Sequence, residues 1–472
     1  MRLVAVGWLS FVVVASARCG GRDVPPTPVA TTNAAALHPC ETGRGPASCG
    51  TIAVFEDRAT RRGRTIDIAF LVARAETPGA REALFVFAGG PGEGSTDLAG
   101  SAFGWLAPVR TALDIVYVDQ RGTGRSHPLQ CSSNGEGNPA GVFGHVFDPA
   151  VVARCRTELE GYADLSKYTT DDAVADVDDV RAALGYERIS LHGGSYGTRM
   201  AQAYMRRFPK RVRSAVIDGV VPFDNAIPIT YAASAQQSLE RVWAACDAST
   251  VCRWRHPRIA ADFDGLLRRL DAGPVPTTFS AAGTSVTVPF SRGDFGYAVR
   301  GILYRADSVS QLPDMIGRAA ASGDFSEFAE AYWSRDAGLD QVIAFGTHLS
   351  VFCAEDVPFP TEADIDQATA GTFLGRYLFD EYRNACRAWP QGHIAADART
   401  PVTTPVPTLL VSGAFDPVTP PAFADRVARS LPVSLSITDP AASHGSSLGC
   451  ALPAVLYVLE RGTLGGAPPA CR

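Results

Sequence analysis

Short apolar runs alternate with helix-like stretches in two separate parts of the chain. In the first part the apolar runs cover residues 51–55, 65–72, 83–88, 114–118, 189–191 and 213–218, and helical patterns cover 171–184 and 198–208. In the second part, runs at 408–412 and 433–438 alternate with helical patterns at 421–430 and 448–460. Fully apolar strands separated by helices predict a mostly parallel sheet covered on both faces by helices.

The alternation stops after Pro222 and resumes only after Pro405. The intervening stretch is helix-like and rich in loops. A chain of 472 residues is also too long for one simple core. We therefore predict an α/β core built from residues 46–221 and 405–472, with a large, mainly helical cap at 222–404 inserted before the late strands.

The N-terminus has the pattern of an export signal. Arg2 precedes an apolar run over 3–17 that is short for a bilayer span and ends in small residues. We predict a signal peptide at 1–17 and a flexible tether at 18–45. Cys19 also suggests a lipid anchor, although Arg18 stands where lipoprotein signals carry a small residue. The expected location is secreted, periplasmic or at the cell surface.

Cysteine usage agrees with an oxidising compartment. Eleven cysteines less Cys19 leave ten, and neighbour pairing is the simplest arrangement, although sequence alone does not fix connectivity. Cys-x2-Cys spacing is absent, so we expect no metal site, and no cofactor is needed. The net charge of −6 argues against nucleic acid as a partner; the oligomeric state is left open. The expected pairs are Cys40 with Cys49, Cys131 with Cys155, Cys246 with Cys252, Cys353 with Cys386, and Cys450 with Cys471.

The run Gly193-Gly194-Ser195-Tyr196-Gly197 lies between a predicted strand and a predicted helix. Gly-x-Ser-x-Gly in this context is the nucleophile elbow of α/β hydrolases, in which the serine occupies a strained turn. Glycine at the flanking positions lets the strand and helix backbones approach closely. We predict that Ser195 is a nucleophile and that the Tyr196 N–H faces the developing oxyanion.

A serine nucleophile needs a base, and the base needs an orienting acid. Asp416 follows the late apolar run 408–412, and His444 is the one histidine that lies beyond it. The chain order Ser195, Asp416, His444 is that of α/β hydrolases. The loop after the strand at 83–88 should supply the second oxyanion N–H, and we assign it to Gly90.

Four motifs together resemble the prolyl iminopeptidase and tripeptidyl aminopeptidase family, and the cysteine-bearing tail is similar to its tripeptidyl aminopeptidase branch. They are the glycine loop 89–92, the turn Asp-Gln-Arg-Gly-Thr-Gly-Arg-Ser at 119–126, the elbow, and the tail with Asp416 and His444. One departure is Ala88, where the iminopeptidases have histidine; this weakens a narrow proline-specific interpretation.

The resemblance implies a hydrolase that acts on peptide substrates with a free N-terminus and releases one or a few residues. In this family carboxylates of the cap recognise the substrate ammonium. The segment 351–356 resembles such a cap segment, which makes Glu355 the expected amine-binding residue and Asp356 the alternative. Two other functions stay open at this point. One is an esterase or small-amide hydrolase on the same triad, and the other is a non-catalytic lipoprotein scaffold.

Overall fold

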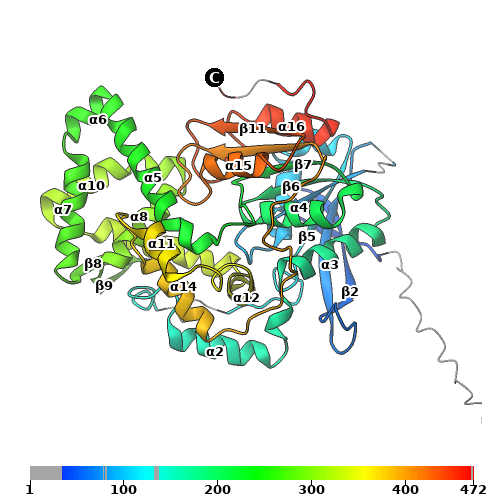
Figure 1. Ribbon diagram of the computed structural model, residues 1–472, viewed down its shortest axis with the longest axis horizontal. Coiled ribbons are helices and arrows are strands. Elements are labelled where there is room, and N and C mark those ends of the chain that lie inside the picture. Colours follow the sequence, from blue (N-terminus) through cyan, green and yellow to red (C-terminus); the bar gives the residue numbers. More distant parts are fainter. Residues whose placement is uncertain (1–34, 78, 80–81, 132–137, 469–470, 472) are drawn as a thin grey trace, which may run out of the picture. The chain divides into compact units, whose positions relative to one another are not determined.

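The computed structural model describes residues 35–77, 79, 82–131, 138–468 and 471. The predicted signal peptide, most of the tether and Cys19 lie outside these residues. The principal sheet is nine-stranded within this part of the chain (Figure 1). Its strands, in spatial order, are β1 (His38–Glu41), β2 (Pro46–Phe55), β3 (Thr65–Ala73), β5 (Asp114–Val118), β4 (Ala83–Phe87), β6 (Ile189–Gly194), β7 (Val212–Asp218), β10 (Thr408–Gly413) and β11 (Ser434–Asp439).

The neighbours from β5 to β11 pair in parallel, and β1, β2 and β3 extend the sheet antiparallel at one edge. Strand β4 explains why the central strands read as unbroken apolar runs. Phe85 and Phe87 belong to the hydrophobic cluster on one face, whereas Leu84 and Val86 belong to the cluster on the other. Both faces are buried, so alternation with polar residues is lost. The predicted mostly parallel α/β fold is confirmed.

Helices cover both faces of the sheet. The first face packs against α3 (Thr170–Ala183), α4 (Tyr196–Arg207) and α15 (Pro421–Ala428). The opposite face packs against η1 (Ser95–Phe103), α1 (Ala107–Arg110) and α16 (Leu452–Arg461). The short turns η2 (Leu165–Lys167) and η3 (Pro209–Arg211) precede α3 and β7. The boundaries of α3 and α16 lie within a few residues of those expected from the sequence.

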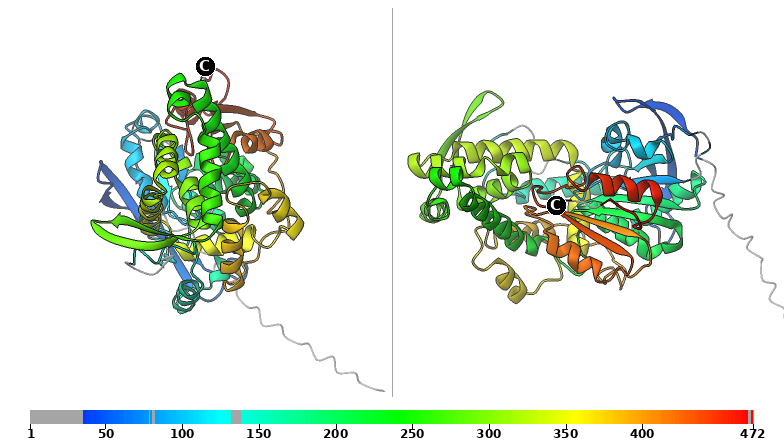
Figure 2. Two further views of the ribbon diagram at one scale, coloured as in Figure 1. Left: turned by 90° about the vertical axis from the view of Figure 1, so that its left-hand side faces the viewer. Right: turned by 90° about the horizontal axis from the view of Figure 1, so that it is seen from above.

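The segment between β7 and β10 is mainly helical (Figure 2), and its buried side chains form one hydrophobic core together with residues between β5 and α3. That core is rich in buried aromatic rings, including Phe263, Phe295, Phe325 and Phe328. The segment also contains a two-stranded antiparallel hairpin that the sequence interpretation did not anticipate. Its elements are α5 (Ile227–Ala248), α6 (Thr250–Arg255), α7 (Ile259–Asp271), β8 (Val275–Ala281), β9 (Thr284–Phe290), α8 (Arg292–Leu303), α9 (Ala306–Val309), α10 (Leu312–Ser322), α11 (Ser326–Val342), α12 (Phe345–Glu355), α13 (Glu362–Thr369) and α14 (Tyr377–Arg387).

All ten cysteines expected to pair form disulfides with the expected neighbours. Cys49 of β2 is buried, and its bond to Cys40 ties β1 to β2 at the edge of the sheet. Cys252 of α6 is only partly buried, and its bond to Cys246 ties α6 to the end of α5. The bonded pairs are Cys40 with Cys49, Cys131 with Cys155, Cys246 with Cys252, Cys353 with Cys386, and Cys450 with Cys471.

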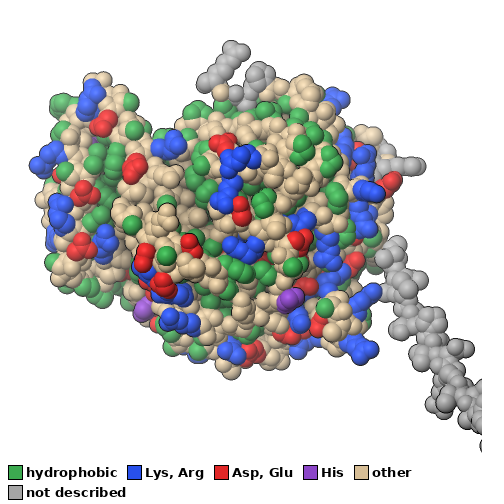
Figure 3. All heavy atoms as spheres, viewed as in Figure 1, with side chains coloured by type: hydrophobic (Ala, Val, Ile, Leu, Met, Phe, Trp, Pro, Cys, Tyr) green, Lys and Arg blue, Asp and Glu red, His purple; other side chains and the backbone are tan. Residues whose placement is uncertain are grey.

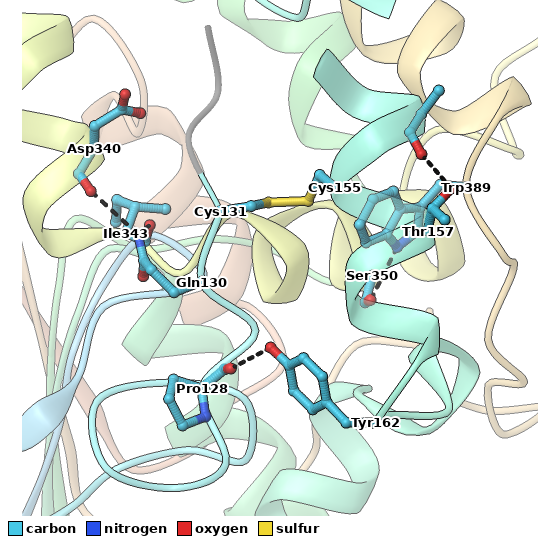
Figure 4. Close-up of a disulfide and its surroundings, with 11 residues drawn as sticks. Pro128, Gln130, Cys131, Cys155, Thr157, Tyr162, Asp340, Ile343, Ser350 and Trp389 are labelled. Atoms are coloured by element: carbon cyan, nitrogen blue, oxygen red, sulfur yellow. Dashed lines mark hydrogen bonds between the residues drawn. A yellow bond between two sulfur atoms is a disulfide. The ribbon is translucent and has the colours of Figure 1, made fainter. Parts of the chain in front are cut away.

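Two of the disulfides stabilise the helical segment and the loop beside it. The bond between Cys353 and Cys386 joins α12 to α14 within that segment. The bond between Cys131 and Cys155 ties the loop after β5 to α2 (Pro149–Glu160), next to residues of α11 and α12 (Figure 4). Gln130 Nε2 of this loop donates to two backbone carbonyls, so the loop is fastened to α11 as well. These carbonyls belong to Asp340 and Ile343.

The molecular surface carries no single dominant charge on the face seen in Figure 3, where basic and acidic side chains are interspersed. Among the helices that the structure describes, none is both long enough and apolar enough to cross a membrane.

Candidate active site

Ser195 occupies the turn between β6 and α4, with φ 54° and ψ −121°. A non-glycine residue at positive φ is strained, and such strain persists only where the surroundings hold it. A Cβ on Gly197 would lie 2.4 Å from the carbonyl oxygen of Phe87, and one on Gly193 would lie 2.2 Å from the carbonyl oxygen of Gly197. The two glycines are therefore required for the strand and helix to approach each other here.

The predicted acid and base are in direct contact. Asp416 follows β10, His444 follows β11, and His444 Nδ1 lies 2.8 Å from Asp416 Oδ2. Asp416 is almost fully buried and also accepts hydrogen bonds from the backbone N–H groups of Val418 and Thr419. The Thr419 hydroxyl donates to Asp416 Oδ2 at 2.6 Å. The carboxylate is thus held in place by three hydrogen bonds in addition to the one that it makes with the imidazole.

This environment sets the protonation of the pair. Burial acts to lower the pKa of His444, but the charge and the hydrogen bond of Asp416 outweigh it and raise the pKa to about 9. Burial acts to raise the pKa of Asp416, and the contacts with His444 and Thr419 more than offset it, leaving that pKa below its usual value. The pair therefore favours an imidazolium beside a carboxylate, the charge state that a general base reaches after it takes a proton.

Ser195 and His444 line the same cavity, which has a volume of about 320 Å³. Gly89, Gly90 and Glu93 of the loop after β4 line it too. Gly90 has φ +101° and precedes a cis bond to Pro91. The N–H of Gly89 donates to Glu93 Oε2 at 3.1 Å, so the glutamate fixes the loop from within. Burial raises the pKa of Glu93 above its usual value.

Tyr196 is the first residue of α4, where backbone N–H groups have no partner inside the helix. Its side chain is buried away from the cavity and contacts the side chains of Thr170 and Gln120. Any contribution of Tyr196 to an oxyanion site is therefore limited to its backbone N–H. The other predicted donor, Gly90, lies on the cavity wall itself.

The predicted amine-binding carboxylates are not among the residues that line this cavity. Glu355 ends α12 and accepts hydrogen bonds from the backbone N–H and the hydroxyl of Thr170, both at 2.7 Å. Burial raises its pKa to about 7. Asp356 forms a bidentate pair with Arg199 of α4, at 2.7 and 2.9 Å. Both carboxylates thus join α12 to α3 and α4, which explains their burial without a ligand.

Several residues that the sequence interpretation missed stand at the site. Thr419 lies three residues after Asp416, a spacing typical of turns in which an aspartate accepts local hydrogen bonds. Tyr304, Arg300 and Arg335 come from the helical segment and line the cavity with His444. The carbonyl oxygen of Tyr304 also accepts a hydrogen bond from the backbone N–H of His444 at 3.2 Å. No local pattern marks these three residues, because their position depends on how the helical segment packs.

Comparisons with known proteins bear on the fold and on the family. Residues 83–448 match the family model described as alpha/beta hydrolase fold. Serine protease Hip1 of Mycobacterium tuberculosis is 27% identical over 449 residues, covering 89% of this chain and 85% of the relative. Tripeptidyl aminopeptidase of Streptomyces lividans is 32% identical over 194 residues, covering 37% and 36%.

Proline iminopeptidase of Neisseria gonorrhoeae is 30% identical over 132 residues, covering 28% of this chain and 30% of the relative. The resemblance expected from the motifs is thereby confirmed at the level of the family and its peptidase relatives. The chain belongs to the α/β-hydrolase family, as a serine hydrolase whose relatives include serine peptidases.

Proposed function

We propose that this protein is an exported serine aminopeptidase with Ser195, Asp416 and His444 as its catalytic triad. The observation that carries the proposal is the hydrogen-bonded pair of Asp416 and His444 that shares one cavity with Ser195 and the glycine loop. The strained backbone at Ser195 supports its assignment as the nucleophile, since such strain collects at active sites.

The chemistry follows from these positions. His444 takes the proton of Ser195 as the hydroxyl attacks the peptide carbonyl, and Asp416 stabilises the imidazolium that results. The backbone N–H groups of Gly90 and Tyr196 receive the oxyanion of the tetrahedral intermediate. His444 then gives the proton to the leaving amine, and water later attacks the acyl-enzyme by the same route. No step requires a metal or an organic cofactor.

An aminopeptidase must also recognise the free ammonium of its substrate, and we assign this role to Glu93 rather than to Glu355 or Asp356. A methyl group placed on Gly89 would lie 3.3 Å from Ser195 Cβ and 3.5 Å from Glu93 Oε2. The carboxylate therefore stands close to the nucleophile on the cavity wall. Its burial leaves it a better partner for a cation than a solvated acid would be.

Comparing free and N-acetylated peptides of one sequence tests the aminopeptidase assignment. We expect the free peptide to be cleaved at least about tenfold faster in kcat/KM, since the ammonium adds a charge-assisted contact. Equal rates for the two peptides would mean a peptidase that does not recognise the free amine, whereas cleavage of an ester but of neither peptide would indicate an esterase or small-amide hydrolase on the same triad. A protein that cleaves neither peptide nor ester would be a binding scaffold, and the proposal would fail.

Two matched variants locate the amine site. Glu93→Gln keeps the acceptor for the Gly89 N–H and removes the charge. The expected loss of kcat/KM on the free peptide corresponds to about 2–4 kcal/mol of transition-state stabilisation. An uncharged ester should be affected much less. Glu355→Gln serves as the comparison. A selective loss on free peptides in Glu355→Gln, without one in Glu93→Gln, would return the amine site to the residue expected from the sequence.

Export is part of the proposal and is supported by the five disulfides and by the relative Hip1. The cleavage of a signal peptide at 1–17 and the lipid on Cys19 are proposals of the sequence alone. Mass spectrometry of the mature N-terminus decides between them. A free N-terminus near residue 18 indicates secretion, a diacylglyceryl group on Cys19 indicates anchoring, and an uncleaved chain in the cytoplasm would contradict export.

A further inference from the structure

Two arginines of the helical segment line the same cavity as Ser195 and His444. Arg300 lies on α8 and is only 3% exposed, and Arg335 lies on α11. Neither is used by the proposed mechanism. A buried guanidinium is costly unless its charge and its five N–H groups are compensated. The partners of these two side chains therefore decide what the arginines can bind.

Those partners are largely aromatic. Arg300 Nη2 donates to the Tyr304 hydroxyl at 3.0 Å, and the Arg300 guanidinium lies 4.1 Å above the ring of Tyr231. The Arg335 guanidinium lies 5.0 Å from the ring centre of Tyr297 and 4.9 Å from that of Tyr304. Ring faces attract the charge but leave N–H donors unused. Among the residues that the structure describes, Arg300 Nε and Arg335 Nη1 are both buried without a hydrogen-bond partner.

Tyr304 shows which sign of charge this corner favours. Its ring lies 5.2 Å from that of His444, and both guanidinium groups also lie close to it, at 5.1 and 4.9 Å from its centre. Burial acts to raise the pKa of Tyr304, but the charges of Arg300, Arg335 and His444 lower it below its usual value. The charge of Asp416 acts to raise the pKa of Tyr304, but the net shift is still downward. The three cations therefore favour a negative charge at the Tyr304 hydroxyl, whereas burial raises the pKa of the neighbouring Tyr231.

The cavity wall also carries the carboxylates of Glu93, Asp336 and Asp340. Burial acts to lower the pKa of Arg335, but Tyr297, Tyr304 and Asp336 raise it, so part of the charge of Arg335 is balanced within the protein. Each guanidinium nevertheless keeps one buried donor without a partner, and a carboxylate could accept a charge-assisted N–H···O bond from each of them.

We propose that Arg300 and Arg335 form a carboxylate-binding subsite beside His444, which makes peptides that present a carboxylate there the preferred substrates. This inference rests on the proposed peptidase function and adds the substrate class. The carboxylate can come from two sources, an acidic side chain of the peptide or the C-terminus of a short peptide. Both present the same planar anion, and a comparison of two substrate pairs distinguishes them.

Two substrate pairs are compared by kcat/KM. The first pair differs by Glu against Gln within an otherwise identical peptide with an amidated C-terminus. The second differs by a free against an amidated C-terminus in a short neutral peptide. In the wild type we expect a preference of about 30-fold for the carboxylate in one of the two pairs. The pair that shows the preference identifies the source of the carboxylate.

In Arg300→Gln and Arg335→Gln that preference should fall to within about threefold of unity. Arg300→Lys should keep an intermediate preference, because it retains the charge without the planar fork. Each rate is divided by the rate on an uncharged ester, which corrects for the folded fraction. Arg305→Gln is the matched control; Arg305 lies just after α8 with its side chain 74% exposed and should keep the wild-type preference.

The outcomes distinguish failure of the carboxylate subsite from failure of the proposed peptidase function. Wild-type enzyme that cleaves peptides and ester without preference in either pair would overturn the subsite and leave the peptidase function intact. A preference that survives in both glutamine variants would overturn the assignment to these arginines. Failure of the wild type to cleave any peptide, with the ester still cleaved, would overturn the proposed peptidase function and this inference with it.

Discussion

The substitution Asp416→Asn should change both the pKa of His444 and the rate of hydrolysis. His444 Nδ1 lies 2.8 Å from the carboxylate, which is buried and fixed by three further hydrogen bonds. The pKa of about 9, against an ordinary value of about 6.5, corresponds to a preference of about 3 kcal/mol for the charged imidazole. Asparagine keeps the size of the side chain and removes the charge that causes this preference.

The assay is the pH dependence of kcat/KM on an uncharged ester. A general base must be neutral to act, so kcat/KM should rise about tenfold per pH unit below the pKa of His444. The midpoint of this rise should lie above pH 6.5 and towards 9 in the wild type. In Asp416→Asn it should fall to about 6.5 or lower, with a maximal rate reduced by about 10³- to 10⁴-fold.

Asp425→Asn is the control, because Asp425 is an exposed carboxylate on α15 and should leave the profile unchanged. An unchanged midpoint in Asp416→Asn would show that the carboxylate does not set the pKa of His444. A wild-type midpoint below pH 6.5 would show that the carboxylate fails to offset the burial of the imidazole.

The pair of Asp416 and His444 should also make the unfolding free energy depend on pH. The folded-state pKa of His444 lies above its unfolded value, so the pair contributes fully below about pH 6.5 and loses that contribution as the pH rises to about 9. The difference in unfolding free energy between wild type and Asp416→Asn, measured with urea, should therefore shrink over this window. A difference that grows with pH there would contradict the linkage.

Three further substitutions test individual contacts. Thr419→Val removes a 2.6 Å hydrogen bond to the acid and should lower kcat/KM about tenfold, with a loss of about 1–3 kcal/mol in unfolding free energy; an unchanged rate would show that the hydroxyl is dispensable. Gly197→Ala places a Cβ 2.4 Å from a carbonyl oxygen of β4 and should lower the unfolding free energy by about 3 kcal/mol or more, measured by urea denaturation; a wild-type value would contradict the close approach. Replacing Cys353 and Cys386 by alanine should lower that free energy by about 2–4 kcal/mol; no loss would mean that the bond does not constrain the unfolded chain.

The fold and the strained turn at Ser195 could be predicted because their determinants are local. The fully apolar run at 83–88 indicates a strand buried on both faces, and Ser195 stands in a short motif whose glycines are required by the backbone itself. Asp416 and His444 were found from chain order, since each follows a late strand of the parallel sheet. Their hydrogen bond then results from the pairing of β10 with β11.

The cysteine pairs could be predicted for a similar reason. Cys40 and Cys49 lie on adjacent antiparallel strands, and Cys246 and Cys252 lie on consecutive helices, so each pair is brought together by local structure. Neighbour pairing is correct for these two pairs because the chain turns back on itself between the two cysteines.

The helical segment could not be interpreted in the same way. Glu355 ends α12 and was expected to face a substrate. Its side chain instead accepts two hydrogen bonds from Thr170 of α3 and is buried there. That direction is set by packing between helices distant in sequence. Arg300 and Tyr304 reach the cavity for the same reason. The β8–β9 hairpin did have a local pattern, because Val286, Val288 and Phe290 place an apolar residue at every second position of β9, yet it was missed among the surrounding helices.

Covalent labelling can identify the nucleophile, which we propose to be Ser195. The purified protein is treated with a fluorophosphonate and digested, and the modified peptide is identified by mass spectrometry. We predict a single adduct on Ser195 that forms faster as the pH rises towards 9, because His444 must be neutral to activate the hydroxyl. The same protein with Ser195→Ala should stay folded and unlabelled. An adduct on another residue, or none on a folded wild-type protein, would contradict the account.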